Sequence, residues 1–445
     1  MALLPAGALG ASNASPGQAA HAATPDTKPG RVSSAGNPLA KERFAEARRL
    51  MGEGAAEKAI AAVQEGLKLD PRSTEGLNLL GIIYDQQKDY AQSLAAFRRA
   101  LEIDPRSTET RNNLGLSYFT QKKLDLAKQE FQASLRIDPR DRTANYNLGL
   151  MRLGEGKPKD AIAYLRRVNP PDASVSINLV QAYLRAGEAA EAMKLVHSVS
   201  AQAPSDVRLH FSLGVMLAAD KQYAPAVHEL ELADALQPGT IEILHDLGQV
   251  YLEDHQPEKA QQVLQRAAKL APGSAETLYL LGRAYADQRN NVQALEVLLR
   301  ARKIAPQNTD IIFLMARLSM IQSFYEDAIQ LLEEGVKIAP QRPDLRAALG
   351  ESYFTAGQID KAKEQFQTLL ELDPSAPSYV FMGLCYRHLG RFDEAKKYFN
   401  LGLEKDPRNA ACLYNLGFIA NKQGDQAAAE TFLEAALHTN PDYDD

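Results

Sequence analysis

A proline returns at a nearly fixed interval of 34 residues along most of this 445-residue chain. The prolines in register are Pro71, Pro105, Pro139, Pro204, Pro238, Pro272, Pro306, Pro340, Pro374, Pro407 and Pro441. The one long gap, from Pro139 to Pro204, equals two intervals less three residues. Because a period of this length is typical of stacked supersecondary units, the chain is predicted to fold as one tandem array.

Other residues keep the same period and indicate two amphipathic helices in each unit. In the unit 108–141, Leu114, Gly115 and Tyr118 fall on one helical face, and Ala127 and Phe131 continue it in a second helix. Leu-Gly pairs recur at Leu80, Leu114, Leu148, Leu213, Leu247, Leu281, Leu349 and Leu416. Small residues allow two helices to approach closely, and the proline ends the second helix. We therefore interpret these repeated residues as structural, with no binding role.

This pattern of Leu-Gly, Tyr, Ala, Phe or Leu and a closing Pro resembles the tetratricopeptide repeat family. The resemblance covers residues 40–441 as about twelve repeats. It implies an all-α fold, a right-handed α-α superhelical solenoid of tandem helix-turn-helix repeats. Each pair is too small to bury its own apolar face, so its stability is expected to come from stacking on its neighbours.

The ends of the chain differ from the array. Residues 1–39 are rich in Ala, Ser, Gly and Pro and are expected to be disordered, and residues 442–445 form a short acidic tail. The apolar opening of the chain resembles the end of a secretory signal, although it lacks the basic start of such signals. An exported, periplasmic location in a bacterium is therefore favoured over the cytoplasmic alternative.

The array is irregular near residues 168–175, where Pro170 and Pro171 are expected to shorten a second helix. Two interpretations stay open. The irregularity divides the array into residues 40–172 and 173–441, or it is a tolerated deletion in a loop.

Charge and composition exclude several classes of function. The formal net charge is −6, from 50 basic and 56 acidic residues, which argues against nucleic-acid binding. No run of apolar residues is long enough to form a transmembrane segment. The only two cysteines, Cys385 and Cys412, are expected to be buried free thiols rather than a disulfide.

The family resemblance implies that the first helix of each repeat lines a concave binding surface. The residues two positions before the Leu of each Leu-Gly register are then candidates for contact with a peptide or partner. The candidates at this position are Phe44, Asn112, Tyr146, Phe211, His245, Tyr279, Phe313 and Tyr414. Rings at a fixed spacing suit the apolar side chains of an extended peptide, and amides suit its backbone. The alternative is that an aromatic residue here is common in the repeat even without a ligand.

Three asparagines directly before the Leu position form a second candidate group: Asn113, Asn147 and Asn178. They belong to consecutive repeats, so they could form an amide ladder resembling those with which some family members hold a peptide backbone. The alternative is that each makes a local hydrogen bond between helices. The carboxylate clamp of chaperone-binding members is disfavoured, because no lysine occupies the candidate position.

No catalytic, metal-binding or cofactor-binding motif is present, and the eight histidines are scattered. The leading hypothesis is a non-catalytic scaffold that binds peptides or partner proteins, in an envelope or secretion assembly if the protein is exported. One alternative is a self-assembling structural protein, which forms homo-oligomers through an uncapped last repeat carrying Phe432, Leu433 and Leu437. Another is the regulatory portion of a larger enzyme complex.

Overall fold

The structure is a computed structural model that describes residues 37–440. The predictions for the first 36 residues, for Pro441 and for the acidic tail lie outside the described residues. All regular secondary structure between residues 37 and 440 is α-helical, in 24 helices, which confirms the predicted all-α fold of paired helices. The first helix begins at Pro38, two residues before the predicted start of the array.

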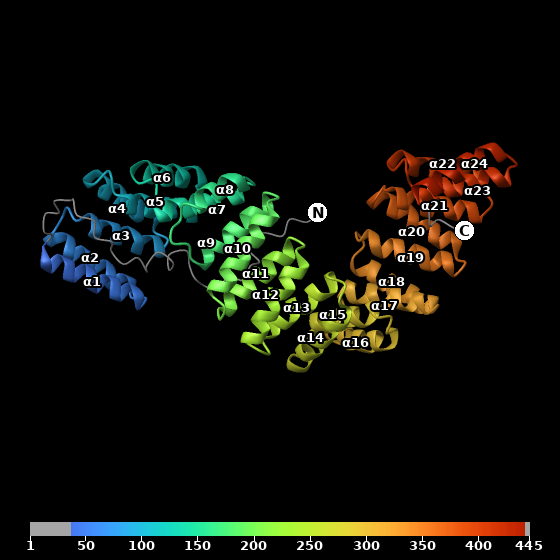
Figure 1. The fold of residues 1–445 in the computed structure, drawn as a ribbon, viewed down its shortest axis with the longest axis horizontal. Coiled ribbons are helices and arrows are strands. Elements are labelled where there is room, and N and C mark those ends of the chain that lie inside the picture. The colour runs from blue at the N-terminus through green and yellow to red at the C-terminus, as the bar shows by residue number, and fades with distance from the viewer. Residues whose placement is uncertain (1–36, 441–445) are drawn as a thin grey trace. The chain divides into compact units, whose positions relative to one another are not determined.

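The chain divides into two compact units, one ending at Pro204 and one beginning at Ser205, which we call the first and second units. The described helices of the first unit are α1 (Pro38–Gly52), α2 (Ala56–Leu69), α3 (Thr74–Gln86), α4 (Tyr90–Ile103), α5 (Thr108–Thr120), α6 (Leu124–Ile137), α7 (Arg142–Gly154), α8 (Pro158–Leu165), α9 (Ala173–Arg185) and α10 (Ala189–Gln202). Figure 1 shows them stacked in consecutive pairs within the unit.

The second unit continues the same arrangement of paired helices. Its described helices are α11 (Val207–Ala219), α12 (Tyr223–Leu236), α13 (Ile241–Glu253), α14 (Pro257–Leu270), α15 (Ala275–Asp287), α16 (Asn291–Ile304), α17 (Thr309–Ile321), α18 (Tyr325–Ile338), α19 (Pro343–Thr355), α20 (Ile359–Leu372), α21 (Ala376–His388), α22 (Phe392–Lys405), α23 (Ala410–Lys422) and α24 (Gln426–Thr439).

Short polar residues set the boundary between one pair and the next. Before α5, Asp104 Oδ1 accepts a hydrogen bond of 3.0 Å from the Arg106 N–H, which closes a turn around Pro105. Ser107 Oγ then accepts a hydrogen bond of 3.2 Å from the Thr110 N–H and caps the new helix. The Asp-Pro-x-Ser sequence therefore ends one helix and begins the next within four residues.

Close approach of the two helices of a pair depends on a glycine facing a large side chain. A Cβ atom on Gly282 would lie only 2.7 Å from the Leu298 side chain. In α9 the larger Val180 replaces this glycine, and the facing position in α10 holds the shorter Val196, and both valines are buried. The sizes at the two positions compensate one another, so the pair tolerates the loss of the glycine.

The irregularity near residue 168 is a short helix. Helix α8 has eight residues, whereas the other even-numbered helices, such as α6, have fourteen. Helix α9 nevertheless packs against α7 and α8, so the first unit continues through this point. The boundary between the compact units lies after Pro204, one helix pair later than the alternative boundary at residues 172–173.

Candidate peptide-binding surface

The odd-numbered helices form the inner side of each unit. Neighbouring odd-numbered helices contact one another in the first unit, as in α1 with α3 and α3 with α5, and in the second unit from α11 through α21. Neighbouring even-numbered helices make no comparable contacts. The elements that lie closer together occupy the inside of a bend, so we call the exposed faces of the odd-numbered helices the inner surface.

All of the candidate residues lie on odd-numbered helices, but they differ in burial. Phe44 is 1 % exposed, and its ring occupies the space beside Gly66 and Gly76. Asn112 is also buried, and its Nδ2 donates to Asp141 Oδ1 at 2.8 Å. These two side chains hold helices together and are not open to a ligand. The half-buried candidates are Asn113, Tyr146, Asn147, Asn178, Phe211, His245, Tyr279, Phe313 and Tyr414.

The side-chain amides of the three candidate asparagines of the first unit all donate hydrogen bonds within the protein. Asn113 Nδ2 donates to Asn78 Oδ1 in the preceding repeat at 3.1 Å, and Asn178 Nδ2 donates to the Tyr146 hydroxyl at 3.2 Å. Asn147 Nδ2 and Asn178 Nδ2 each donate within their own helix, to a backbone carbonyl at 2.8 Å. Each amide therefore spends a donor locally, and the three side chains do not form a continuous ladder with one another.

The inner surface of the second unit carries rings beside basic groups. In α17 the guanidinium of Arg317 lies 6.0 Å from the centroid of the Phe313 ring, one helical turn away. Tyr279 and Arg283 repeat this spacing in α15, where Arg283 Nη2 lies 3.3 Å from Glu253 Oε1. Burial raises the pKa of the Tyr279 hydroxyl, so the ring carries a neutral phenol at physiological pH.

His245 continues the row in α13 with an imidazole that lies between two carboxylates. Its Nδ1 lies 3.2 Å from Asp246 Oδ1, and its Nε2 lies 3.6 Å from Glu276 Oε1. The hydrogen bond to Asp246 raises the pKa of the imidazole, an effect that burial partly opposes. The neighbouring carboxylates therefore favour the charged form of the His245 imidazole.

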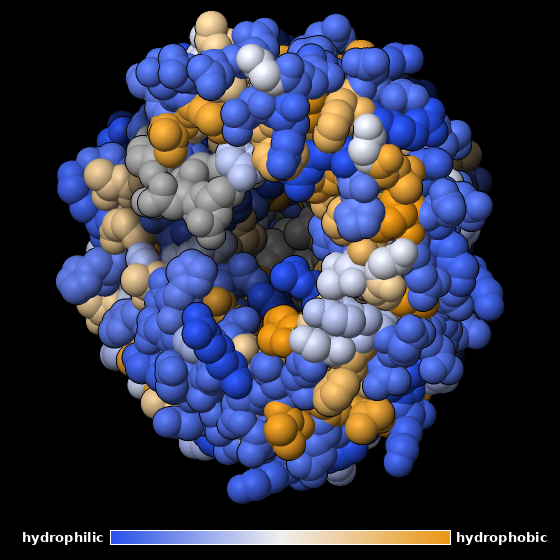
Figure 2. All heavy atoms as spheres, turned by 90° about the vertical axis from the view of Figure 1, so that its right-hand side faces the viewer, coloured by the Kyte–Doolittle hydropathy of each residue, from blue (hydrophilic) through white to orange (hydrophobic). Residues whose placement is uncertain are grey.

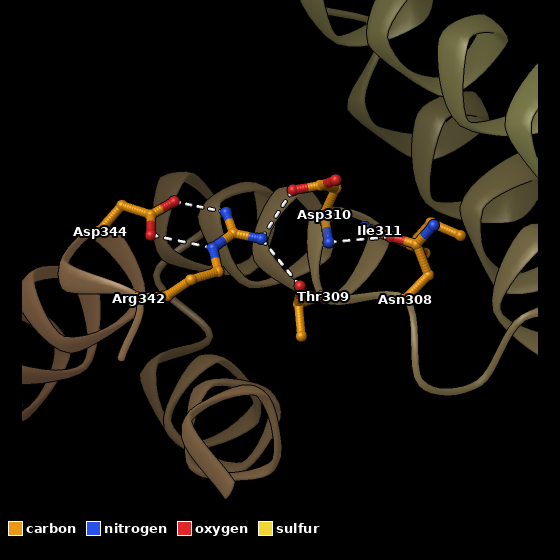
Figure 3. A network of polar contacts seen from close by, with 6 residues as sticks. All are labelled: Asn308, Thr309, Asp310, Ile311, Arg342 and Asp344. Carbon is orange, nitrogen blue, oxygen red and sulfur yellow. Dashed lines mark hydrogen bonds and ion pairs between the residues drawn. The ribbon is translucent and has the colours of Figure 1, made fainter. Parts of the chain in front are cut away.

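Arg342, which the sequence reasoning did not single out, joins two repeats beside Phe313. Figure 3 shows its guanidinium between Asp344 on one side and Asp310 and Thr309 on the other. Nη1 donates to Asp310 Oδ1 at 2.7 Å and to Thr309 Oγ1 at 2.8 Å, and Nε donates to Asp344 Oδ1 at 3.0 Å. The Arg342 guanidinium lowers the pKa of the Asp344 carboxyl, and the network fixes α17 against α19.

A second group of basic side chains beside an aromatic ring lies on α21 and α23. The Arg387 guanidinium lies 4.9 Å from the Phe418 ring centroid, and Lys422 Nζ lies 5.7 Å from the same centroid. Arg387 Nη1 donates to Asn415 Oδ1 at 2.6 Å, while the buried Asn415 donates in turn to the Ala411 carbonyl at 2.7 Å. We call Arg387, Phe418 and Lys422 the basic–aromatic group.

The basic–aromatic group differs from the Arg342 network because, among the described residues, its cations have no carboxylate partner. Within residues 37–440, neither Arg387 nor Lys422 forms an ion pair, whereas Arg342 is held by two carboxylates. This group was not among the predicted residues, which lie only one and two positions before the Leu of each repeat. The positions two and six residues after the Leu lie on the same helical face, and their Phe and Lys in α23 were visible in the sequence.

Three further features of the described residues concern metal binding, membrane insertion and the cysteines. No group of three or more His, Cys, Asp or Glu side chains that could hold a metal ion occurs within residues 37–440. None of the helices in this range is both long and apolar enough to cross a membrane. Cys385 and Cys412 are buried free thiols, as expected.

The last pair exposes part of an apolar face. Leu433 packs beside Gly417, and Leu437 of α24 is 45 % exposed. Figure 2 looks toward the side on which α22 and α24 lie in Figure 1, and apolar side chains there occur in small groups between hydrophilic ones.

Comparison with known proteins supports the family. Two family profiles, both described as tetratricopeptide repeat, match residues 44–108, 112–174, 152–213, 245–309, 322–382 and 386–445. No curated protein matches the chain.

Solved structures with a similar chain fold include yeast Tom70, with a TM-score of 0.44, 16 % identity and coverage of 90 % of this chain and 92 % of that chain. Another is the APC/C Cut9–Hcn1 hetero-tetramer, with a TM-score of 0.43, 13 % identity and coverage of 91 % and 94 %. Pseudomonas aeruginosa PilF has a TM-score of 0.41, 21 % identity and coverage of 45 % and 92 %. Because the matched profiles together cover most of its residues, the chain belongs to the tetratricopeptide repeat family.

Proposed function

We propose that this protein is a non-catalytic scaffold whose second unit binds an extended, acidic segment of a partner protein along its inner surface. Membership of the family supports the general role of a protein-interaction scaffold. The basic–aromatic group carries the finer proposal. Its two cations flank an aromatic ring and form no ion pair within the described part of the chain.

The geometry of this group favours an anionic side chain next to an apolar one. Asn415 holds one edge of the Arg387 guanidinium, so the other edge is oriented and keeps donors for a carboxylate. Lys422 is exposed and supplies a second positive charge from the next helical turn of α23. The Phe418 ring between them offers an apolar contact for a neighbouring side chain of the same segment.

The rest of the row lengthens the surface over which an extended segment lies. Phe211, Tyr279 and Phe313 are half-buried and belong to odd-numbered helices of the same unit. Their fixed spacing matches a segment that contacts successive repeats. The finer suggestion of an exported envelope or secretion assembly rests on the apolar opening of the sequence alone.

Short synthetic peptides test this proposal with the full chain. An array of unstructured peptides that pair Asp or Glu with an apolar residue is compared with the same array carrying Asn or Gln. We expect the acidic peptides to bind more tightly, and Arg387→Gln with Lys422→Gln to weaken them by about tenfold or more, because a hydrogen bond to a charged group contributes about 1.5–3 kcal/mol.

Arg300→Gln is the matched control for charge. Arg300 is exposed on the even-numbered helix α16 and forms no ion pair among the described residues, so its replacement should leave binding unchanged. Equal binding of acidic and amide peptides, or equal loss in the Arg300 variant, would refute the proposal.

Self-assembly through α24 is the alternative function, which the exposed Leu437 favours. Light scattering over a range of protein concentrations separates the two. A monomer at every concentration contradicts self-assembly, whereas an oligomer that Leu437→Glu dissociates supports it.

A further inference from the structure

A pocket opens on the other side of the first unit, between the even-numbered helices α2 and α4. Its volume is about 390 Å³, and helix α3 forms its floor through Leu77, Leu80 and Tyr84. Leu67 of α2 and Ala96 of α4 form its apolar walls. The pocket is separate from the inner surface, because these α3 residues point between the even-numbered helices.

The pocket is bordered by two facing positions, of which the one on α4 holds a small side chain. Leu77 stands four residues before the Gly of its repeat, and Ala96 stands one residue before Phe97, which packs on that Gly. Among the equivalent positions of the regular repeats, the residue corresponding to Ala96 is a Glu, Tyr, Leu, Val, Gln or Phe. Only Ala62 of the atypical first repeat is as short as Ala96 at this position, and the space beside Ala96 stays open.

The next repeat holds longer side chains at the same two positions. There Arg111 and Glu130 take the places of Leu77 and Ala96, and Arg111 Nη1 lies 2.9 Å from Glu130 Oε2. The ion pair spans the two helices with side chains that are much longer than Leu77 and Ala96. The chain thus contains both a short apolar pair and a long ionic pair at one packing position.

The rim of the open pocket is basic and polar. Lys68 and Arg99 line it, together with the amides of Gln64 and Gln92. Arg99 Nη2 donates to the Pro71 carbonyl at 3.3 Å, and neither Lys68 nor Arg99 forms an ion pair among the residues from 37 to 440. An apolar floor beneath two uncompensated cations complements a ligand that is apolar at its tip and anionic beside it.

We propose that this pocket is a second, independent binding site, which receives a bulky apolar side chain of a partner protein with a neighbouring Asp or Glu. A leucine, methionine or phenylalanine side chain enters between α2 and α4 and contacts Leu77 and Leu80. The adjacent carboxylate pairs with Lys68 or Arg99, and Gln64 and Gln92 hydrogen-bond to the backbone of the segment. The partner would therefore be held on the side of the first unit opposite to the inner surface.

The Arg111–Glu130 ion pair of the next repeat suggests a variant that tests the proposal. Leu77→Arg combined with Ala96→Glu transplants the Arg111–Glu130 pair into the open position and should fill the pocket within a folded chain. Ala96→Leu fills the same space without adding charge, so it separates loss of volume from a change of charge. Circular dichroism of both variants checks that the helices persist.

The probe is an array of synthetic peptides with a central Leu, Met or Phe flanked by Glu, by Gln or by Lys, applied to the full chain. We expect the Glu-flanked peptides to bind most tightly, and to lose at least about tenfold in affinity with either pocket-filling variant. Lys68→Gln with Arg99→Gln should remove the preference for Glu over Gln while leaving the apolar contribution.

Those peptides whose affinity falls with the pocket-filling variants should keep their affinity for the Arg387→Gln, Lys422→Gln variant, which distinguishes this site from the inner surface of the second unit. The proposal is overturned if none of the apolar–acidic peptides binds, or if those that bind are insensitive to both pocket-filling variants. If the peptides lose binding only with the Arg387→Gln, Lys422→Gln variant, they bind at the inner surface. This result would also overturn the proposal.

Discussion

His210 Nδ1 and Glu229 Oε2 lie 2.7 Å apart inside the first pair of the second unit, with side chains only 1 % and 3 % exposed. These residues occupy the same two positions as Arg111 and Glu130 in an earlier repeat. In several other repeats both positions are apolar, as with Leu244 and Val263, so one packing site accommodates either an apolar contact or a polar pair.

The buried pair predicts opposite effects for single and double substitutions. His210→Ala should destabilise the protein by about 3–5 kcal/mol, because it leaves a buried carboxylate without this partner. The double variant His210→Leu, Glu229→Val transplants the buried Leu244 and Val263 of the next pair, and it should be neutral or stabilising. Urea unfolding, followed by circular dichroism, measures the free energy of unfolding of both variants. A double variant that is less stable than His210→Ala would contradict this account.

The contact between Gly282 and Leu298 predicts a compensating pair. Gly282→Ala places a Cβ atom 2.7 Å from the Leu298 side chain and should cost about 1–3 kcal/mol through overpacking. Leu298→Val should relieve part of that cost, as the natural combination of Val180 with Val196 does. A double-mutant cycle of thermal unfolding measures the coupling, and strict additivity of the two changes would argue against it.

The turn between the two helices of a pair contains one residue with positive φ, and stability at this position should depend on whether it is a glycine. Gly390 has φ of 70° and no atom near the position of a Cβ, so Gly390→Ala should cost about 1–2 kcal/mol from backbone strain alone. Lys122 adopts φ of 60° at the equivalent turn, so Lys122→Gly should stabilise the pair by up to about 1 kcal/mol. Hydrogen exchange of the flanking helices measures each local effect, and stabilisation by Gly390→Ala would contradict the explanation.

The two buried cysteines should react slowly with thiol reagents in the folded state. Burial raises the pKa of Cys385 and of Cys412 to about 12, so both stay protonated at neutral pH. Neither should react with a thiol reagent at pH 8 until the chain unfolds, when both should react. Because the folded pKa exceeds the unfolded one, stability should fall as the pH rises above about 9 toward 12. Rapid labelling of the native protein at pH 8 would contradict this prediction.

The sequence predicted the array well because its signals are local and periodic. The Asp-Pro-x-Ser stretch at residues 104–107 contains both the turn and the cap that separate two pairs. Residues such as Gly282 and Leu298 pack within a single pair, so their spacing in the chain determines their contact. The all-α fold and the pairing of helices therefore followed from the 34-residue period.

The candidate site was less predictable because it depends on contacts between repeats. Phe44 shares its register with the half-buried Tyr279, yet it is buried because Gly66 and Gly76 leave room for its ring. Asn113 turns toward Asn78 of the preceding repeat, and the sequence does not specify this choice of partner. The charge of Arg387 is available only because its neighbour Asn415 is an amide and not a carboxylate, a relationship across 28 residues.

The central claim, that a partner segment lies against the basic–aromatic group, is tested most directly by site-specific photo-cross-linking. A photoreactive residue replaces Asn421, which is exposed on α23 beside Lys422, or Asn400, which is exposed on the even-numbered helix α22. Each variant is irradiated with an acidic peptide selected from the array. The account predicts cross-links from position 421 that Arg387→Gln abolishes, and none from position 400. Equal cross-linking from both positions, or cross-linking from position 400 alone, would contradict it.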